Sequence, residues 1–256
     1  MLMFLRRILN ALRARDWAAI GLELSIVVVG VFIGTLVANW NEKRLEKENT
    51  ERLLTQIQPE LHEFIEFFDS AREYYSVTRS YADVAFAGLA GHSVPDDQFV
   101  IAAYQASQVY GLPNNGENWA LIFGAQQLNN IDDLGIRRGL SRVMTANYAD
   151  LDFRSVATPY REHVRQIIPI ELQEAIRRAC GDRTNPGKLA FLSLPRTCDL
   201  RLPKGQFAGT ASRLRAKPEL ADELRWHLAA VATFMANMDQ LEVQVRDLSL
   251  KIDATD

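Results

Sequence analysis

The sequence predicts an all-α protein with one N-terminal transmembrane helix, which continues into a helical stalk and a bundle-like soluble helical domain. Three observations support this prediction. Residues 17–40 form a single run that is apolar enough to cross a membrane. Much of the remaining chain carries apolar residues at helical spacing. Proline and glycine gather in a few breaks, and the least regular stretch covers residues 181–208.

The first 16 residues are expected to form a basic cytoplasmic tail. They contain four arginines and one aspartate, which gives this segment a charge of +3. Leu5, Ile8, Leu9 and Leu12 can share one face of a helix. The segment is therefore either a short helix lying in the membrane interface or a disordered basic tail.

The predicted anchor covers residues 17–40, WAAIGLELSIVVVGVFIGTLVANW, and Glu23 is its one charged residue. At about 1.5 Å per residue the helix measures roughly 36 Å, enough to cross a hydrocarbon core of about 30 Å. Trp17 and Trp40 stand at its two ends, where indole rings prefer the headgroup level. A cleavable signal peptide is the alternative, but its apolar region is normally shorter and ends in a small-residue cleavage site.

One face of the anchor is expected to bind another helix. Glu23, Gly30 and Gly34 lie within about 40° of each other, and Ala38 flanks the same stripe. Glycines four residues apart allow a second helix to approach closely, and an ionisable group inside a membrane tends to face protein or water. We therefore expect a homo-oligomer or a protein partner here. In the alternative interpretation, Glu23 only extends toward the lipid headgroups.

Residues 41–58 follow as a solvated helical stalk, rich in charges at helical spacing. The soluble domain is expected to cover residues 59–256. Its first helix has an apolar stripe at steps of three and four, and Pro59 predicts a kink or break there. The aromatic residues between Phe64 and Tyr75 are expected in the core rather than in a ligand site.

Further helices are expected between the remaining breaks. They cover roughly residues 96–110, a short segment around Trp119, a segment from about 133 to about 166, residues 169–181, and residues 218 to about 252. Asp132 or Asp133 is expected to cap the third of these, which would continue past Pro159. Within the irregular stretch, Leu189 to Leu194 predicts one short strand.

Cys180 and Cys198 are a candidate disulfide, because they flank the irregular loop. Such a bond requires an oxidising compartment, for example a bacterial periplasm. Two unpaired, small hydrophobic side chains are the alternative. The positive charges on either side of the anchor are equal in number, so the positive-inside rule alone does not orient it. Because a disulfide between the two cysteines would place the domain in an oxidising compartment, we expect a bacterial inner-membrane protein whose N-terminus is cytoplasmic and whose domain is periplasmic.

Two segments resemble one protein family. The first is Glu23, the apolar run through Gly30, and then Asn39-Trp40-Asn41-Glu42; the second begins at Trp119 and includes Ile136, Arg137 and Leu140. Both resemble a family of bacterial single-pass membrane proteins classed as a domain of unknown function. Leu22 and Gln126 stand where that family has glycine. The resemblance implies an anchored helical domain and supplies no catalytic residues.

The sequence contains no recognisable catalytic, cofactor or metal motif. Its four histidines are far apart, and none has the spacing of a metal site. No nucleophile elbow is present. Residues 41–256 carry a charge of −5, because the whole chain carries −3, the tail +3 and Glu23 −1. An acidic domain of this kind argues against a nucleic-acid partner.

Three functions remain open from the sequence. The first is a non-catalytic envelope protein that binds a protein partner or acts as a scaffold, with lipid around its anchor. The second is an extracytoplasmic domain that senses a small ligand, and the third is a membrane-tethered enzyme. The missing motifs make the enzyme the least favoured of the three.

Overall fold

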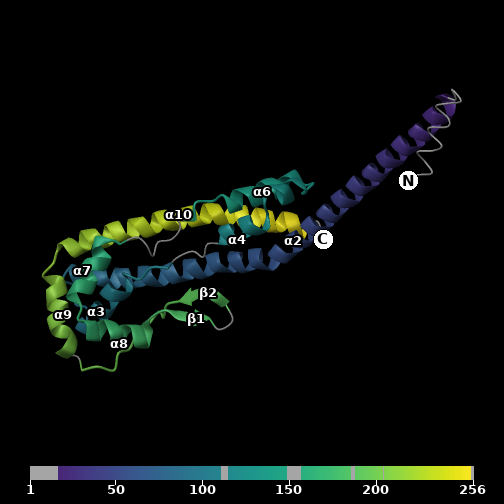
Figure 1. Ribbon diagram of the computed structural model, residues 1–256. Coiled ribbons are helices and arrows are strands. Elements are labelled where there is room, and N and C mark those ends of the chain that lie inside the picture. The colour runs from purple at the N-terminus through teal and green to yellow at the C-terminus, as the bar shows by residue number, and fades with distance from the viewer. Residues whose placement is uncertain (1–16, 111–114, 149–156, 186–187, 204, 255–256) are drawn as a thin grey trace.

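The computed structural model describes residues 17–110, 115–148, 157–185, 188–203 and 205–254, and Figure 1 shows their arrangement. It confirms the all-α class, because the described chain is mainly helical and its β-structure is limited to one short hairpin. The elements are α2 (Trp17–Leu89), α3 (Asp96–Gln105), α4 (Asn115–Ile122), α5 (Ala125–Asn129), α6 (Leu134–Met144), α7 (Pro159–Ile167), α8 (Ile170–Cys180), β1 (Arg183–Asn185), β2 (Lys188–Ser193), α9 (Gly205–Arg215) and α10 (Glu219–Asp253).

Helix α2 is one continuous helix of 73 residues, with an exposed N-terminal part and a part packed in the domain. Of the kink or break expected at Pro59, the break is absent, because the helix continues through this residue, whereas α2 does change direction near the point where it enters the domain (Figure 1). Ile57 and Leu61 are both buried on either side of the proline. Packing of these neighbours against the domain offsets the lost backbone hydrogen bond, which by itself costs roughly 3 kcal/mol in a helix interior.

Helix α10 runs back antiparallel along α2, and its end lies near the point where α2 enters the domain (Figure 1). The sequence predicts this helix correctly, with bounds that differ by about one residue. The side-chain amide of Gln58 donates to Asp253 over 2.5 Å and ties the end of α10 to α2. Further along, the buried carboxylate of Glu242 pairs with Arg72 of α2 and with Arg246 of α10.

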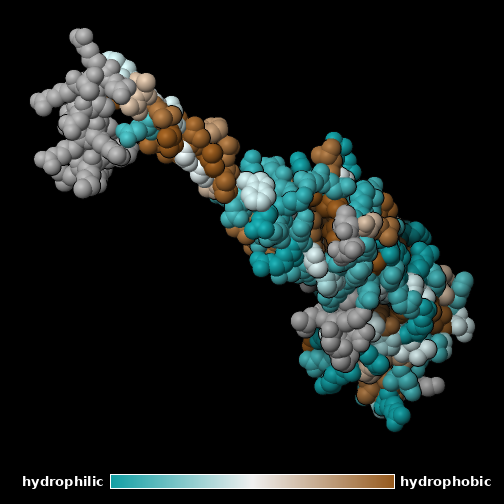
Figure 2. Space-filling view, turned by 90° about the vertical axis from the view of Figure 1, so that its right-hand side faces the viewer, coloured by the Kyte–Doolittle hydropathy of each residue, from teal (hydrophilic) through white to brown (hydrophobic). Residues whose placement is uncertain are grey.

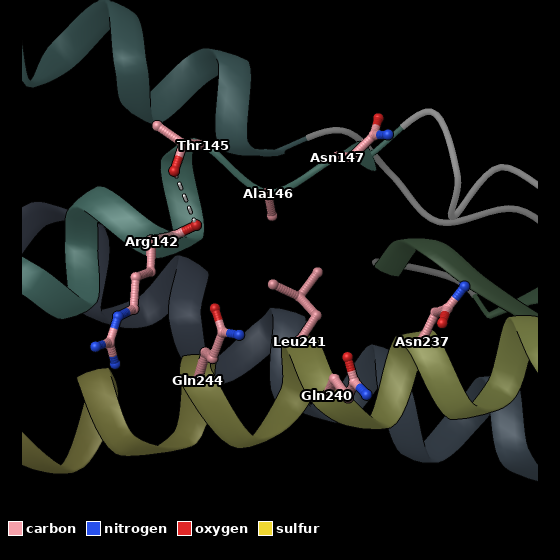
Figure 3. Close-up of a pocket in the computed structure, with 8 residues that line it drawn as sticks. All are labelled: Arg142, Thr145, Ala146, Asn147, Asn237, Gln240, Leu241 and Gln244. Carbon is pink, nitrogen blue, oxygen red and sulfur yellow. Dashed lines mark hydrogen bonds between the residues drawn. The ribbon is translucent and has the colours of Figure 1, made fainter.

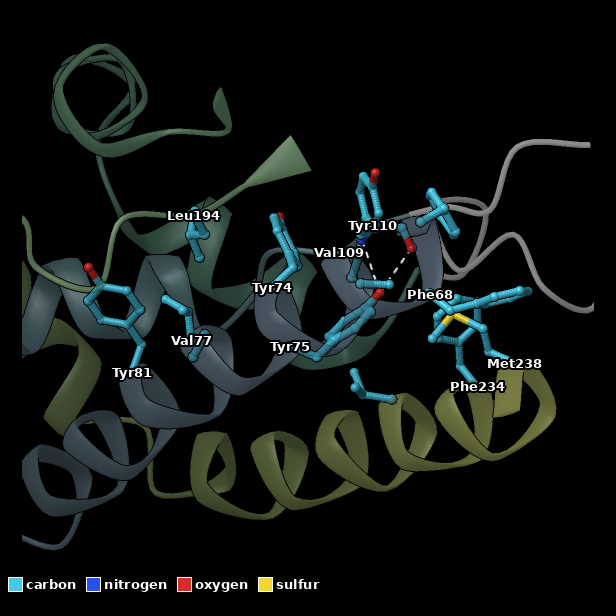
Figure 4. Packing of buried hydrophobic residues seen from close by; sticks show 14 of the residues in the cluster. Phe68, Tyr74, Tyr75, Val77, Tyr81, Val109, Tyr110, Leu194, Phe234 and Met238 are labelled. Atoms are coloured by element: carbon cyan, nitrogen blue, oxygen red, sulfur yellow. Dashed lines mark hydrogen bonds between the residues drawn. The ribbon is translucent and has the colours of Figure 1, made fainter. Parts of the chain in front are cut away.

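Aromatic rings fill the space beside α2, as the sequence predicts. Phe64 and Phe68 have ring centroids 4.8 Å apart, and the rings of Tyr74 and Tyr110 stack at 5.2 Å. Figure 4 shows Tyr75 directed at the backbone of Tyr110. Its hydroxyl donates to the Tyr110 carbonyl over 2.9 Å and accepts from the Tyr110 N–H over 3.0 Å. The polar end of this buried ring is therefore satisfied.

The smaller helices gather at the two ends of the α2–α10 pair. Helices α4, α5 and α6 lie at the end near the exposed part of α2, while α3, α7, α8 and α9 lie at the far end (Figure 1). The side chain of Asp133 accepts a hydrogen bond from the N–H of Ile136 over 2.8 Å and caps α6, which confirms one of the two expected caps.

The prediction of one helix from about residue 133 to about residue 166, continuing past Pro159, is wrong. Helix α6 ends at Met144, and α7 is a separate helix that begins at Pro159. Thr158 caps α7, and proline occupies the first helical position, where its missing N–H costs least. Residues 149–156 of the expected helix lie outside the described residues. Helix α3 is also shorter than expected, because it ends at Gln105 rather than near residue 110.

The irregular stretch contains a two-stranded hairpin where one strand is expected. Strand β1 pairs antiparallel with β2, and Thr184 faces Leu192. The N–H of Leu192 donates to the Tyr110 hydroxyl over 3.0 Å, so the hairpin is joined to the aromatic core. Both strands are short, and this tertiary contact supplies support that a lone hairpin lacks in water.

Candidate functional site

The N-terminal part of α2 extends out of the domain as an exposed apolar helix. Figure 2 shows this hydrophobic segment projecting from a mostly hydrophilic surface. Trp17 and Trp40 are 69% and 67% exposed, and no residue in the most apolar 18-residue stretch of the helix is buried. Within the part of the chain that the structure describes, α2 is the one helix with the length and composition of a membrane span. A signal sequence near the N-terminus has the same length and composition.

The four residues expected to form an association face lie on this exposed helix. A methyl group placed at Gly30 or Gly34 would meet no atom within 4 Å, so the face is open in the single chain. The Ser25 and Thr35 hydroxyls donate to carbonyls of their own helix, Gly21 and Phe32, over 2.7 and 2.9 Å. Polar groups in the apolar segment are thereby satisfied locally, as they must be in lipid.

The face of α2 that contains Gly30 and Gly34 points away from the domain. At 100° per residue, Asn41, Leu45 and Glu48 lie within about 60° of Gly30, and all three are exposed. Thr50 and Ile57, which are buried, lie about 180–200° from Gly30. The stripe that includes Glu23, Gly30, Gly34 and Ala38 therefore continues along the stalk on the side opposite the bundle.

The stalk also contacts the domain on its other side. The Lys47 ammonium donates to the Asp132 carboxylate over 2.5 Å. This contact raises the pKa of Lys47 and lowers the pKa of Asp132, because each charge favours the ionised form of the other. Both side chains are exposed, so the pair orients the stalk more than it stabilises the fold.

Cys180 and Cys198 are joined by a disulfide in the structure, with Cα atoms 5.5 Å apart. The bond links the end of α8 to the segment that follows the hairpin. The hydroxyl of Tyr81 in α2 donates to the carbonyl of Pro195 over 2.8 Å, which holds the same segment against the bundle. The irregular stretch is thus attached to the domain by a covalent bond and by hydrogen bonds.

A polar cluster that the sequence analysis missed lies between α3, α7 and α8. The Arg165 guanidinium lies over the ring of Tyr104 at 5.1 Å from its centroid and donates to Gln108 over 3.1 Å. The Arg177 guanidinium donates to the Tyr104 hydroxyl over 3.2 Å. Arg161 stands one helical turn before Arg165 on α7. That spacing was the one available sequence signal, since it places both arginines on the same face.

Desolvation and mutual repulsion alter the acid–base properties of this cluster. Burial lowers the pKa of the Arg165 guanidinium, and Arg161 and Arg177 lower it further. Desolvation raises the pKa of the Asp182 carboxyl. The hydrogen bond from Tyr74 and the charges of Arg165 and Arg161 lower this pKa and so offset part of the rise. The Tyr74 hydroxyl donates to Asp182 over 2.9 Å, and burial together with this carboxylate raises the pKa of Tyr74.

The histidines do not form a site together. His227 is 1% exposed, and its Nδ1 lies 2.8 Å from the Thr158 hydroxyl. His163 lies 2.8 Å from Glu223, and His62 lies 3.4 Å from Asp253. Among the described residues, no three His, Cys, Asp or Glu side chains are grouped as metal ligands.

A shallow depression of about 380 Å³ lies between the end of α6 and the middle of α10 (Figure 3). Its lining residues are mainly amides and short side chains: Arg142, Thr145, Ala146, Asn147, Asn237, Gln240, Leu241 and Gln244. The Thr145 hydroxyl is bonded to the Ser141 carbonyl over 2.8 Å. The lining includes no histidine or carboxylate that could activate this hydroxyl, so the depression has no nucleophile–base pair.

Comparisons with protein-family models, with curated proteins and with solved structures found no significant match to this chain, so its sites are interpreted from their own geometry.

Proposed function

We propose that this protein is a bacterial inner-membrane protein that presents a non-catalytic helical domain to partner proteins in the periplasm. The observation that carries the proposal is the exposed apolar part of α2. Nearly all large apolar side chains there are exposed, and water is an unfavourable surrounding for such a surface. Lipid around residues 17–40 removes that cost without any further protein contact.

The disulfide supports the proposed location. A bond between Cys180 and Cys198 forms and persists in an oxidising compartment, and the cytoplasm keeps such thiols reduced. With the domain in the periplasm, residues 1–16 lie in the cytoplasm, where an arginine-rich segment is favoured. The resemblance of the anchor to single-pass bacterial membrane proteins of unknown function is consistent with this topology.

Two features support protein contacts over catalysis. The Gly30–Gly34 face is open and is directed away from the bundle, which suits association with a second copy of α2. On the domain itself, Val243 and Leu250 are 68% and 69% exposed and stand seven residues apart on one side of α10. Exposed apolar side chains in such a row suit a protein partner.

Membrane insertion is tested by alkaline carbonate extraction of membranes from cells that produce the full chain. We expect the protein to remain in the membrane pellet, with an intact N-terminus by mass spectrometry. A matched Val29→Arg, Phe32→Arg variant is expected to shift to the soluble fraction, because each charge is costly at the centre of a bilayer. Extraction of the wild-type chain, or cleavage before residue 41, would refute the anchor.

Topology is tested with a single added thiol on the exposed face of α2. In a Ser80→Cys variant, a membrane-impermeant maleimide is expected to label intact spheroplasts, because Ser80 lies on the domain surface. The native cysteines are expected to resist the reagent until a reductant is added. Labelling that requires lysis of the spheroplasts would place the domain in the cytoplasm.

The interaction role is tested by crosslinking in membranes, followed by identification of the co-purified proteins. We expect a self-crosslinked species or a reproducible partner. A Val243→Asp, Leu250→Asp variant is expected to lose a partner that binds α10 and to keep the contact between anchors. Neither a partner nor a self-crosslink in wild-type membranes would reject the proposal.

A further inference from the structure

The polar cluster between α3, α7 and α8 contains three arginines that share a small region of the fold. Arg165 stacks on the ring of Tyr104, and Arg177 donates to the hydroxyl of the same tyrosine over 3.2 Å. One tyrosine side chain thus holds two guanidinium groups near each other. Arg161 joins them from the preceding turn of α7.

Carboxylates compensate this charge only in part. Among the described residues, Arg161, Arg165 and Arg177 form no ion pair with an acidic side chain. The nearby carboxylate, Asp182, accepts its hydrogen bond from Tyr74 instead. Counting one negative charge for Asp182 against the three arginines leaves 3 − 1 = +2. Other arginines that join elements do have a carboxylate partner, for example Arg215 with Asp96 over 2.8 Å and Arg196 with Glu73 over 2.5 Å.

One donor in the cluster also lacks an acceptor. The Nε–H of Arg165 is buried and has no hydrogen-bond partner, although the same guanidinium donates from Nη2 to Gln108. A buried donor without a partner costs roughly 1–3 kcal/mol, and more when the group is charged. Native proteins rarely retain such a cost unless a ligand or an ordered water meets it.

We propose that this cluster binds a small divalent oxyanion, such as inorganic phosphate, sulfate, or the phosphate or dicarboxylate group of a soluble metabolite. Two or more oxygens would accept from the planar forks of Arg165 and Arg177, a geometry for which guanidinium groups are suited. A charge of −2 would match the local charge of +2. The inference stands apart from the proposed scaffold role, since it concerns a different end of the domain.

The position of the cluster favours a dissolved anion over a lipid headgroup. Helices α3, α7 and α8 lie at the end of the domain remote from the exposed apolar helix (Figure 1). Tyr74, whose hydroxyl donates to Asp182 beside the cluster, stands 34 residues after Trp40 on α2, which at 1.5 Å per residue corresponds to about 50 Å. Headgroups of the membrane that holds the anchor are therefore out of reach of the site.

The test is isothermal titration calorimetry of the full chain in a nonionic detergent, with sodium phosphate, sulfate or succinate replacing chloride at constant ionic strength. We expect saturable binding of at least one of these divalent anions and none of chloride. Vesicles of anionic phospholipid added to the same protein are expected to leave the affinity for the dissolved anion unchanged. Competition by the vesicles would instead identify a headgroup as the ligand and overturn the assignment to a dissolved anion.

Variants assign the binding to these residues. Arg177→Gln removes an exposed side chain and is expected to fold normally, with an affinity at least tenfold lower. Arg165→Gln is expected to weaken binding further. Arg178→Gln is the matched control, because it changes the charge equally on an exposed neighbouring position of α8. Equal affinity in the wild-type, Arg177→Gln and Arg178→Gln proteins, or no saturable binding of any of the three anions, would overturn the proposal.

Discussion

His227 is a buried titratable residue whose environment makes the stability of the fold depend on pH. Burial lowers its pKa to about 4, and the charge of Arg161 acts in the same direction. The Thr158 hydroxyl is 2.8 Å from Nδ1 and also caps α7 by accepting from the Arg161 N–H over 3.4 Å. The fold therefore holds a neutral imidazole ring where a helix begins.

Because the folded pKa of His227 is lower than the value of about 6.5 in an unfolded chain, acid favours unfolding. The unfolded state takes up a proton below pH 6.5, and the folded state does so only near pH 4. Stability from this residue is complete at neutral pH and decreases as the pH falls through this window. Between pH 7.5 and pH 5 we expect a loss of roughly 2 kcal/mol in the free energy of unfolding.

Denaturant unfolding of the detergent-solubilised protein at the two pH values measures this effect. His227→Asn is expected to lower stability at pH 7.5 and to remove most of the difference between the two pH values. The control is His92→Asn, which changes an exposed histidine and is expected to keep the wild-type dependence. An unchanged dependence in His227→Asn would assign the acid sensitivity to other groups.

Gly88 is a second residue at which the packing is specific. A methyl group at this position of α2 would overlap the aromatic ring of Phe99 in α3, and both residues are buried. Gly88→Ala is therefore expected to lower the free energy of unfolding by roughly 1–3 kcal/mol, in spite of the better helix propensity of alanine. Gly209→Ala in α9 meets no atom within 4 Å and is expected to be neutral or slightly stabilising. Thermal unfolding compares the two, and equal melting temperatures would contradict the predicted overlap.

At the scale of elements, the long helices are predictable from sequence because their signals are local. Residues 17–40 form a continuous apolar run, and the apolar residues of α10 recur at helical spacing over many turns. Pro59 and Pro159 show the limit of local signals. The first is tolerated inside a helix by the surrounding packing, whereas the second begins a new helix with Thr158 as its cap.

The polar cluster was not predictable because its members come from separate elements. Tyr104, Arg165 and Arg177 belong to α3, α7 and α8, and only the folded chain places them together. The same holds for the hairpin, in which β2 is supported by a hydrogen bond to Tyr110 from another part of the chain. The two cysteines differ in this respect, because their position on either side of a loop makes a disulfide a candidate from sequence alone, with two unpaired side chains as the alternative.

The disulfide is expected to stabilise the domain by restricting the unfolded chain. It closes a loop between residues 18 positions apart, which corresponds to about 3 kcal/mol in the chain-entropy model. A Cys180→Ser, Cys198→Ser variant is expected to lose about this amount in denaturant unfolding. Reduction of the wild-type protein should produce a similar loss and leave the variant unchanged. Equal stability of the reduced and oxidised wild-type protein would show that the loop is fixed by its other contacts.

At the scale of the whole molecule, the stalk determines how two copies can approach each other. The exposed stripe of α2 runs from the apolar segment 17–40 through Asn41 and Glu48 and faces away from the bundle. Two copies that pair through Gly30 and Gly34 can thus lie side by side with their stalks in contact and their domains on opposite sides. A parallel pair of this kind needs no rearrangement of either domain.

This geometry predicts which engineered cysteines crosslink in membranes. Asn41→Cys lies about 20° from the Gly30 direction and is expected to form an intermolecular disulfide under mild oxidation. Lys43→Cys is the matched control, because it is also exposed but lies about 220° from that direction. Adding Gly30→Ile and Gly34→Ile to Asn41→Cys is expected to reduce the crosslinked fraction severalfold, since bulky side chains prevent close approach of the helices. If the two cysteines crosslink equally, or if the isoleucines have no effect, the copies do not pair through this face, and the open stripe must serve a different partner or the lipid alone.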